Sequence, residues 1–406
     1  MPPTATAVPT RPVMTAVPQI GTLPGYVPHR IGIRLVDGVA EFYDRVTGKK
    51  FIPRGYNYVR LSPIFGTSGQ MWEETLAPGY YDPDLLELAL RQMHADGYNV
   101  LRVIVDCCRP GKNVGDPRGG LSYPYVENII DVLKRAKAHE IQVILVLHLA
   151  AADGGYSQYW EPYIPEFDKL NLFFLTSGGH TTKRLYDQDL IRALIKRNAP
   201  LDTVLAYDLI GDAGYDLSWP PLSSTTGLVT TANGKKYDMS QPDEKQKMMN
   251  ENYVYWIDRQ RAAILQVDPT ALVTVSFNAF LDKSGVSYAN AAIWQSNADF
   301  FDLHLFFGLR YTLENYVLKF GTLGLNDKPI IIGQLAAAKQ GYPTAAKAAQ
   351  ALVDVQVDSC FYGFDGWILW LYGSEADTAL WNGPTDGGAI NDALAPANRP
   401  DPCQSD

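Results

Sequence analysis

The sequence predicts an α/β protein folded as a (β/α)8 TIM barrel, and three observations support this prediction. Eight short apolar runs alternate with amphipathic helical stretches, and eight strand–helix units are the number that closes a barrel. The runs are almost continuously apolar, which is typical of parallel strands covered on both faces. No glycine-rich turn of the type G-x-G-x-x-G follows an early run, so an open doubly wound sheet is disfavoured.

The composition fits a globular protein with a large core and disfavours two kinds of partner. Hydrophobic residues make up 46% of the 406 residues and charged residues 19%. The net charge is −9 and the 35 Lys and Arg residues are dispersed, which argues against nucleic-acid binding. The longest apolar stretches, such as residues 141–152, are too short to span a membrane. The chain contains 24 Tyr and 8 Trp residues, and such a high content is common in proteins whose aromatic side chains stack on sugar rings.

The chain begins with a segment rich in Pro, Thr and Ala, residues 1–28, which is predicted to be a disordered linker. The segment has no charged region followed by an apolar region and therefore does not resemble a signal peptide. We expect an extracellular or surface-tethered protein whose export signal is not in this chain. Residues 29–406 are expected to form one barrel domain. The domain is expected to begin with a small hairpin over residues 31–51, where strands of alternating apolar and polar residues are separated by Asp-Gly and Thr-Gly turns.

Strands and helices are predicted in alternation after the hairpin. The strands are expected at residues 51–59, 99–105, 142–148, 203–210, 271–277, 299–307, 328–335 and 365–371. The helices are expected at residues 83–96, 124–139, 182–197, 243–267, 311–318 and 344–357. Two long segments, residues 151–179 and 211–240, interrupt the alternation after the third and fourth strands. Both are aromatic and follow the C-terminal end of a strand, where barrel enzymes build their sites, so we expect them to wall a cleft.

Six sequence fragments occur in order on the predicted strands. They are NVLRVIV with Arg102, VILVLH with His148, VLAYDLIGD ending at Asp212, DFFDLHLF with His304, PIIIGQL with Gln334 and GWILW with Trp370. Together they resemble glycoside hydrolase family 5, the cellulase-like barrels of clan A, over about residues 31–403. The resemblance implies a barrel that acts on a β-linked oligo- or polysaccharide. No metal or organic cofactor is implied, because no ligand cluster has suitable spacing.

The resemblance also implies which positions carried the chemistry, and this chain departs from the family at three of them. The family's acid/base Glu falls on Asp212, its nucleophile Glu on Gln334, and the Asn before the acid/base on Gly211. A retaining mechanism needs one carboxylic acid and a second carboxylate about 5 to 5.5 Å away that attacks the anomeric carbon. The amide of Gln334 cannot form that ester. Without an adjacent negative charge, Asp212 is expected to be an ordinary ionised Asp and a poor acid.

Other site residues are expected at the rim because of their positions on the strands. His148 and His304 each end a strand, and Trp370 is expected to form the floor of a sugar subsite. Phe306 stands where the family often has a Tyr that contacts the nucleophile, which agrees with a site that has none. The expected substrate-binding residues are Arg102, His148, Gly211, His304, Phe306, Trp370, Trp160 and Trp219.

The position of Arg102 allows two interpretations. Either its guanidinium supports the nucleophile position, as the resemblance implies, or it forms an ion pair in the barrel core with Asp208 or Asp106. Trp367 faces away from Trp370 in a strand, and Trp256 sits on an amphipathic helix. Both are therefore expected to be packing residues.

Three functions are compatible with these residues. The favoured hypothesis is a barrel that binds a β-linked saccharide without efficient cleavage. The second is an active β-glycosidase with a rearranged carboxylate pair, such as Asp212 with Glu375. The third is a barrel recruited for structural or protein-binding purposes. The candidate replacement carboxylates are Asp106, Asp153, Asp216, Glu375 and Asp377.

The four cysteines permit a disulfide. A bond between the adjacent Cys107 and Cys108 would close a strained ring. Two alternatives stay open, a disulfide from Cys360 or Cys403 to one of these two, or buried free thiols.

Overall fold

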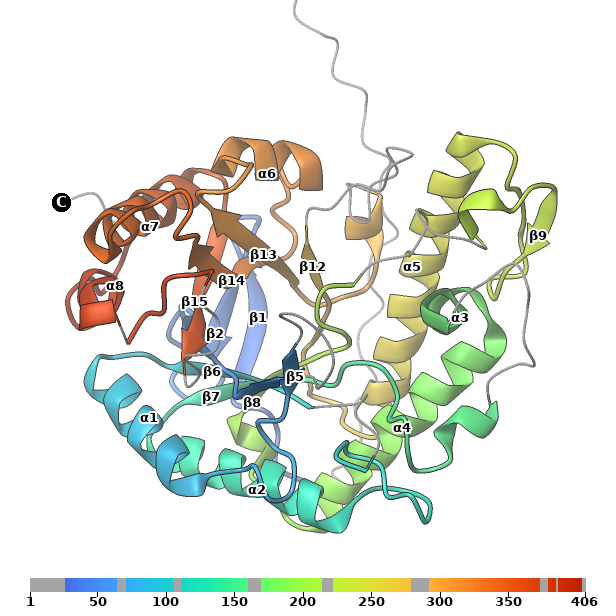
Figure 1. Ribbon diagram of the computed structural model, residues 1–406, viewed down its shortest axis with the longest axis horizontal. Coiled ribbons are helices and arrows are strands. Elements are labelled where there is room, and N and C mark those ends of the chain that lie inside the picture. Colours follow the sequence, from blue (N-terminus) through green and yellow to red (C-terminus); the bar gives the residue numbers. More distant parts are fainter. Residues whose placement is uncertain are drawn as a thin grey trace, which may run out of the picture.

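A computed structural model of the chain describes residues 26–63, 71–105, 111–159, 169–213, 222–278, 292–372, 379–384 and 386–403. Its central sheet has the strand order β11-β8-β7-β6-β3-β15-β14-β13-β12 with all neighbours parallel (Figure 1). The sheet is nearly closed on itself and covered by helices, so the predicted (β/α)8 barrel is the observed fold. The strands are β3 (Arg54–Tyr58), β6 (Val100–Ile104), β7 (Gln142–Val146), β8 (Val204–Asp208), β11 (Val273–Thr274), β12 (Ser276–Asn278), β13 (Phe301–Phe307), β14 (Ile330–Ala337) and β15 (Phe364–Tyr372).

The predicted fifth strand is divided in two, and this division closes the barrel. Its first part, β11, pairs with β8 through Val273 and Tyr207. Its second part, β12, pairs with β13 through Ser276 and Asp302. A bridge between Ala213 and Phe277 connects the segment after β8 to β12. A single apolar run thus joins the two edges of the sheet, although the strand itself is broken at one residue.

All six predicted helices are present. They are α1 (Pro83–Ala95), α2 (Tyr123–Ala138), α4 (Ser177–Lys196), α5 (Pro242–Leu265), α6 (Leu313–Phe320) and α7 (Ala345–Phe361). Helix α4 begins five residues before the predicted start because the Thr176 side chain accepts a hydrogen bond from the Gly179 amide and caps it. None of the described helices is long and apolar enough to cross a lipid bilayer.

Several short elements have no counterpart in the prediction. They are α3 (Lys169–Leu175), α8 (Ala389–Leu394), the hairpins β4 (Leu61–Pro63) with β5 (Met71–Glu73) and β9 (Leu228–Thr230) with β10 (Lys236–Asp238), and 3₁₀ helices at Tyr156–Tyr159, Leu201–Thr203, Leu222–Ser224, Ile293–Gln295 and Asp386–Gly388. Runs of three to seven residues carry too little periodicity to be recognised from sequence. The two long insertions expected to wall a cleft therefore contain structure of their own.

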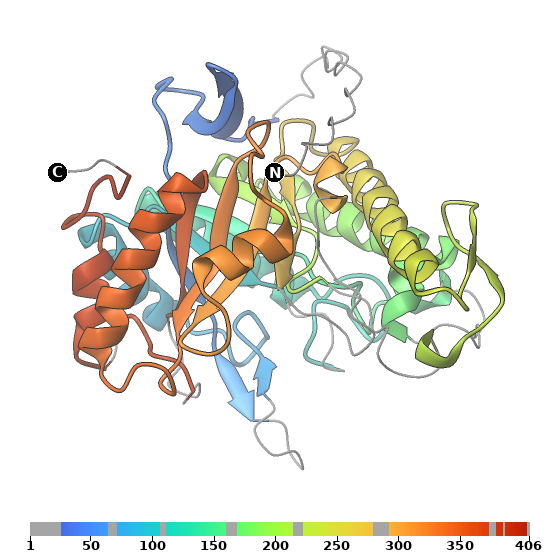
Figure 2. The same cartoon turned by 90° about the horizontal axis from the view of Figure 1, so that it is seen from above.

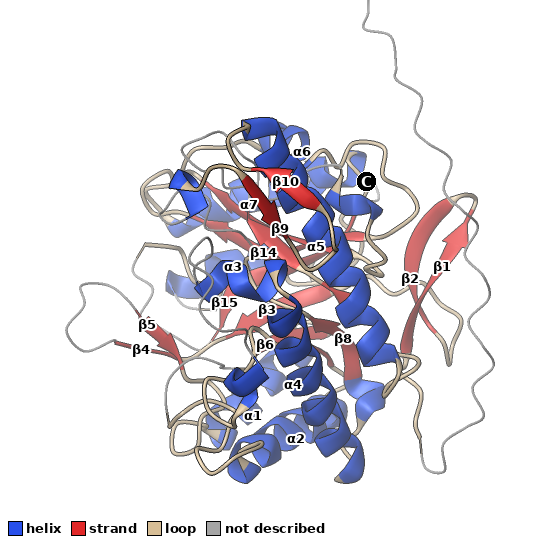
Figure 3. Cartoon of the chain, turned by 90° about the vertical axis from the view of Figure 1, so that its right-hand side faces the viewer, coloured by secondary structure: helices blue, strands red, loops and turns tan. Residues whose placement is uncertain are grey.

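The predicted N-terminal hairpin is β1 (Ile31–Val36) with β2 (Val39–Asp44), and it closes one end of the barrel. Ile31 and Phe42 are buried in a cluster with residues of several barrel strands, including Val100, the first residue of β6. The Phe42 and Phe300 rings meet edge to face with centroids 5.0 Å apart. Figure 2 shows the hairpin outside the barrel, and in Figure 3 β1–β2 and β4–β5 lie on opposite sides of the molecule. The carboxyl ends of the strands lie at the opposite end of the barrel from the β1–β2 hairpin, so the hairpin does not cover a functional site there.

The start of the barrel domain is fixed by a buried carboxylate. Tyr26 and Tyr207 donate hydroxyl hydrogen bonds to Asp268 at 2.6 and 2.8 Å, and His29 Nε2 lies 2.8 Å from the same carboxylate. The predicted boundary at residue 29 was therefore three residues late, because Tyr26 of the predicted linker is bonded to the barrel. Residues 1–25 lie outside the described residues.

The expected disulfide partners of Cys360 and Cys403 were wrong, because the two bond to each other. Their Cα atoms lie 5.4 Å apart, which is ordinary for a disulfide. The guanidinium of Arg54 donates to the carbonyls of Leu394 and Arg399 and so holds the C-terminal segment against the barrel. Cys107 and Cys108 lie outside the described residues. A contact between residues 43 positions apart depends on this docking and could not be deduced from spacing.

Candidate functional site

Three polar side chains form a row across the neighbouring strands β12, β13 and β14. The expectation that His304 ends a strand was wrong, because His304 is the fourth of the seven residues of β13, and Gln334 is the fifth of the eight residues of β14. In the parallel register Asn278 of β12 is beside His304 of β13, and His304 is beside Gln334 of β14. Asp212, which follows β8, accepts hydrogen bonds from the Asn278 amide and from His304 Nδ1, the latter at 2.5 Å. The fold therefore brings together Asp212, His304 and Gln334, as the sequence predicted, and adds Asn278.

Asp212 is held as an anion. Burial alone would raise its pKa, but the charge and hydrogen bond of His304 and the nearby Arg102 and His148 outweigh burial and lower the pKa below its usual range. About half of the side chain, 49%, is still exposed. An ionised Asp212 was expected because the position beside it carries the neutral Gln334. The structure adds a stronger cause, which is direct pairing with an imidazole.

Gln334 presents an uncharged amide beside this pair. The residue is 5% exposed, and within the described part of the chain its amide has no hydrogen-bond partner. The preceding Gly333 is required by close packing, since a Cβ atom there would lie 1.8 Å from Asp302 Oδ1. The backbone of β14 thus passes directly over a buried carboxylate, and the next residue reaches the rim.

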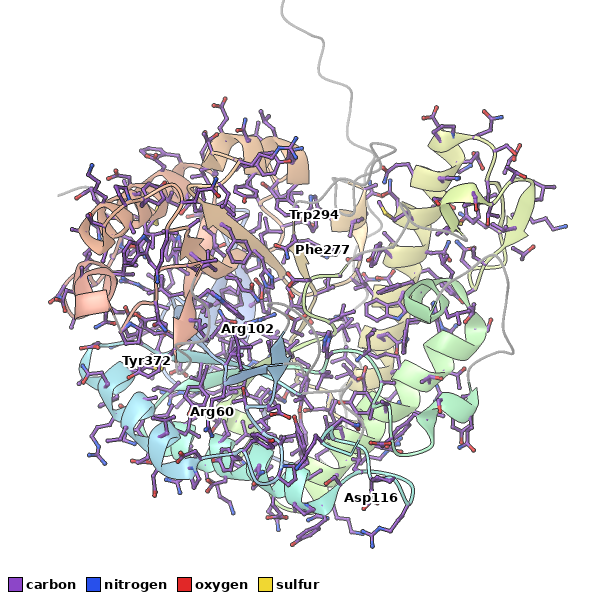
Figure 4. All side chains as sticks on the ribbon, in the orientation of Figure 1. Arg60, Arg102, Asp116, Phe277, Trp294 and Tyr372 are labelled. Atoms are coloured by element: carbon purple, nitrogen blue, oxygen red, sulfur yellow. A yellow bond between two sulfur atoms is a disulfide. The ribbon has the colours of Figure 1, made fainter. Side chains whose placement is uncertain are left out.

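Arg102 lies near the centre of the barrel (Figure 4), and its side chain is fully buried. One guanidinium nitrogen donates to Asp208 at 2.7 Å and to Ser276 at 3.1 Å, and another donates to Asn57 at 3.0 Å. Its Nε lies 3.4 Å from Asp302. Burial lowers the pKa of Arg102, but the two carboxylates raise it above its usual value. The core ion pair with Asp208, one of the two interpretations considered, is therefore present.

Asp302 and Asn278 are the residues that the sequence analysis missed. Asp302 is fully buried, and burial, opposed by the charges of Arg102 and His304, raises its pKa to about 6. His304 Nε2 lies 3.8 Å from Asp302 Oδ1. A polar chain consequently runs from the rim to the core through Asp212, His304, Asp302 and Arg102. The run DFFDLHLF carried the signal, since Asp302 and His304 are two residues apart and face the same side of a strand.

The remaining predicted site residues lie in different surroundings. Trp370 is half-buried against a small cluster that contains Val59, Ile104, Val146 and Leu371. Phe306 is partly exposed, and Tyr316 bonds both its amide and its carbonyl. A Cβ atom at Gly211 would lie 3.6 Å from Val146 and 3.8 Å from Arg102, which are ordinary contacts, so glycine is not required there.

Six of the predicted candidate residues lie outside the described residues, and contacts define the surroundings of the others. The residues outside are Asp106, Trp160, Asp216, Trp219, Glu375 and Asp377. Asp153 accepts hydrogen bonds from the Gly111 amide and from Asn113, both at 2.7 Å, so its carboxylate holds a loop. Trp256 and Trp367 are buried, as predicted for packing residues.

His148 follows β7 with a left-handed backbone, φ 56°, and one buried ring nitrogen without a hydrogen-bond partner. Burial, aided by the charge of Lys183 and opposed by Asp212 and Asp208, lowers its pKa from 6.5 to about 4. Between pH 6.5 and pH 4, His148 is therefore protonated in the unfolded chain and neutral in the folded protein. His148 should therefore lower the free energy of unfolding by about 3 kcal/mol as the pH falls from 7 to 4.

The measurement for His148 is urea denaturation at a series of pH values for the wild type and for His148→Gln. The variant should lose less stability than the wild type below pH 6.5. Parallel curves would contradict the low pKa, as would an imidazolium signal of His148 in NMR spectra at pH 6.

Comparisons with known proteins place this architecture. No protein-family model matches the sequence, and no curated protein matches it. Among solved structures, the endo-β-1,4-mannanase from Thermotoga petrophila is 15% identical, with a TM-score of 0.57 over 89% of this chain and 80% of that chain. The endo-1,4-β-mannanase from Rhizomucor miehei is 14% identical, with a TM-score of 0.56 over 90% and 99%.

An endocellulase from Pyrococcus horikoshii in complex with cellotetraose is 16% identical, with a TM-score of 0.53 over 92% of this chain and 100% of that chain. Structural similarity at sequence identities this low shows a shared fold and nothing more. The chain has the (β/α)8 barrel fold found in β-mannanases and an endocellulase.

Proposed function

We propose that this barrel binds a β-linked oligo- or polysaccharide at the carboxyl ends of its strands and does not hydrolyse it by the retaining route. The observation that carries the proposal is the pair of groups beside His304, a neutral amide at Gln334 and an ion-paired carboxylate at Asp212. Retaining hydrolysis needs a carboxylate nucleophile and a protonated carboxylic acid. Here one group lacks the charge and the other lacks the proton.

The electrostatics of Asp212 support the absence of an acid catalyst. Catalytic acids of glycosidases keep their proton near neutral pH because burial or a neighbouring anion raises their pKa. Asp212 is surrounded by His304, His148 and Arg102, and its pKa is lowered. A group that is ionised throughout the neutral range cannot protonate a leaving oxygen efficiently.

Two further observations support a saccharide ligand and an exported protein. The solved structures with this architecture include enzymes named for their action on mannan or cellulose, and Trp370 presents a half-buried indole at the end of β15. The Cys360–Cys403 disulfide is of the kind that persists in oxidising compartments, which favours an extracellular or surface-tethered location.

The experiment measures binding and turnover in parallel on manno-, cello- and xylo-oligosaccharides. We expect the wild type to bind one of these series and to release no reducing sugar above a buffer blank. Trp370→Ala should weaken binding about tenfold, because stacking and burial of an aromatic ring are worth on the order of 1.4 kcal/mol.

Phe361→Ala is a suitable control, because this ring is 85% exposed on α7. The variant should bind like the wild type. Turnover by the wild type would overturn the non-catalytic assignment. Absence of binding to all three series would instead favour a structural or protein-binding role.

A further inference from the structure

Residues 26–30 form a short strap that precedes β1, and polar contacts tie it to the barrel. His29 is 1% exposed. Its backbone amide donates to Thr270 Oγ1 at 2.9 Å, and the Arg45 guanidinium donates to the His29 carbonyl at 2.9 Å. The Thr270 amide in turn donates to the Tyr26 hydroxyl at 3.1 Å. The strap is therefore bound to the segment that leads into β11.

Both ring nitrogens of His29 face oxygen atoms. Nδ1 lies 2.7 Å from the Val204 carbonyl oxygen at the start of β8, and Nε2 lies 2.8 Å from Asp268 Oδ2. A carbonyl oxygen and an ionised carboxylate can only accept hydrogen bonds. A neutral imidazole has one N–H group and one bare nitrogen, so it can donate to only one of these two oxygens, whereas an imidazolium donates to both. The geometry therefore favours a His29 ring that is protonated on both nitrogens.

Asp268 is held as the matching anion. Besides His29, the Tyr26 and Tyr207 hydroxyls donate to its carboxylate at 2.6 and 2.8 Å. Burial raises the pKa of Asp268, but the charge and hydrogen bond of His29 and the two hydroxyls outweigh burial and lower this pKa below its usual range. Burial and the charge of Asp268 raise the pKa of Tyr26 and of Tyr207, so both phenols keep their protons at neutral pH.

His29 is the member of this cluster whose charge can change near neutral pH. Histidine ordinarily gains or loses its charge between about pH 5 and 8. Arg45 stays charged and donates to the His29 and Thr270 carbonyls. Arg30, at the end of the strap, pairs with Asp44 at 2.8 Å.

Protonation of His29 favours docking of the strap. The charged ring forms an ion pair with Asp268 and donates to Val204, both away from water. When rising pH removes one proton, the ion pair is lost and one ring nitrogen presents a lone pair to an oxygen atom. A buried acceptor that faces another acceptor costs free energy. The contribution of His29 to docking is therefore present at low pH and is lost as the pH rises.

We propose that the strap is a proton-dependent latch, docked on the barrel while His29 carries a proton on each ring nitrogen and released when rising pH removes one of them. Residues 1–25 precede the strap in the chain, so its state determines whether the folded domain begins at Tyr26 or at Ile31. The β1–β2 hairpin remains in place after release, because its inner face is buried against the barrel. The proposal does not depend on saccharide binding at the strand-end site.

The test is an NMR titration of the full protein, deuterated and labelled with ¹⁵N, from pH 6 to pH 9.5. Two-bond ¹⁵N–¹H correlations should show both ring nitrogens of His29 protonated at pH 7, and His29→Gln assigns the signals. The amide protection factors of His29 and Thr270 should fall at least tenfold between pH 6 and pH 9.5. The Val105 amide, which donates to the Val146 carbonyl inside the barrel, should keep its protection.

Variants separate the charge of the ring from its titration. A guanidinium keeps its charge and donates to several acceptors, so His29→Arg should hold the Thr270 protection factor constant across this pH range. His29→Gln should lower it at least tenfold already at pH 6, because an amide presents an oxygen as well as a donor. His94→Gln is the control, since His94 is exposed on α1, and it should titrate like the wild type.

Several outcomes would overturn the proposal. A neutral His29 ring at pH 7 would do so, and the wild-type spectrum gives this result even where His29→Arg fails to fold. Protection factors of His29 and Thr270 that stay constant up to pH 9.5 would contradict release of the strap. Simultaneous loss of protection at Val105 would show unfolding of the whole barrel in place of a local latch.

Discussion

Arg102→Met is expected to lower the free energy of unfolding by about 3 to 5 kcal/mol at pH 7, because it leaves two buried carboxylates without their cation. Asp208 and Asp302 are both fully buried, at 2.7 and 3.4 Å from the guanidinium. Met fills a similar volume but supplies no charge and no donor. Arg102→Lys should restore only part of the lost stability. A guanidinium donates to several partners from its planar fork, whereas a lysine ammonium is a single compact charge that cannot reach all of them.

Urea denaturation followed by tryptophan fluorescence at pH 7 and pH 5 measures this effect. Without Arg102 the Asp302 carboxyl should hold its proton more tightly in the folded state, so the deficit of the Met variant should shrink as the pH falls. Arg118→Met is the control, because Arg118 is 89% exposed in its pair with Asp116, and it should leave the midpoint unchanged. A wild-type midpoint for Arg102→Met would contradict the assigned role of Arg102.

The double variant Asp212→Glu, Gln334→Glu is expected to hydrolyse the oligosaccharide series that the wild type binds, with a rate at least about 100-fold above the wild type. A Glu at position 334 supplies the nucleophile beside His304. Its charge also raises the pKa of a Glu at position 212, which is one methylene longer and can reach the leaving oxygen as an acid.

The single variants are the matched controls, since each supplies half of a pair that acts as a unit, and neither should approach the double variant. We expect that adding Gly211→Asn raises the rate further; a Cβ atom at this position would make only ordinary contacts, at 3.6 Å from Val146 and 3.8 Å from Arg102. Reducing-sugar release is measured together with binding. A double variant that binds like the wild type but yields no product would contradict the expectation that two carboxylates are sufficient for hydrolysis on this scaffold.

The sequence was sufficient for the architecture because the information is local. Each barrel strand is an apolar run of a few residues, and the alternation with helices along the chain leaves few arrangements of parallel strands. The same locality placed His304 and Gln334 on barrel strands and Asp212 just after one, although His304 and Gln334 lie in the middle of β13 and β14 and not at their ends. It also indicated the neutral amide, since the residue type alone decides that Gln334 bears no charge.

What pairs with what was decided by the tertiary structure. Asp212 and His304 are 92 residues apart, and Arg102 and Asp208 are 106 apart. Their contacts depend on the register of β8, β12 and β13 and on the split fifth strand, which no periodicity records. The Cys360–Cys403 bond depends in the same way on the docking of the C-terminal segment. The sequence by itself determined the barrel and the absence of charge on the Gln334 side chain. Only the folded chain determined that Asp212 is held ionised by an imidazole, because a pKa depends on neighbours in space and not on neighbours along the chain.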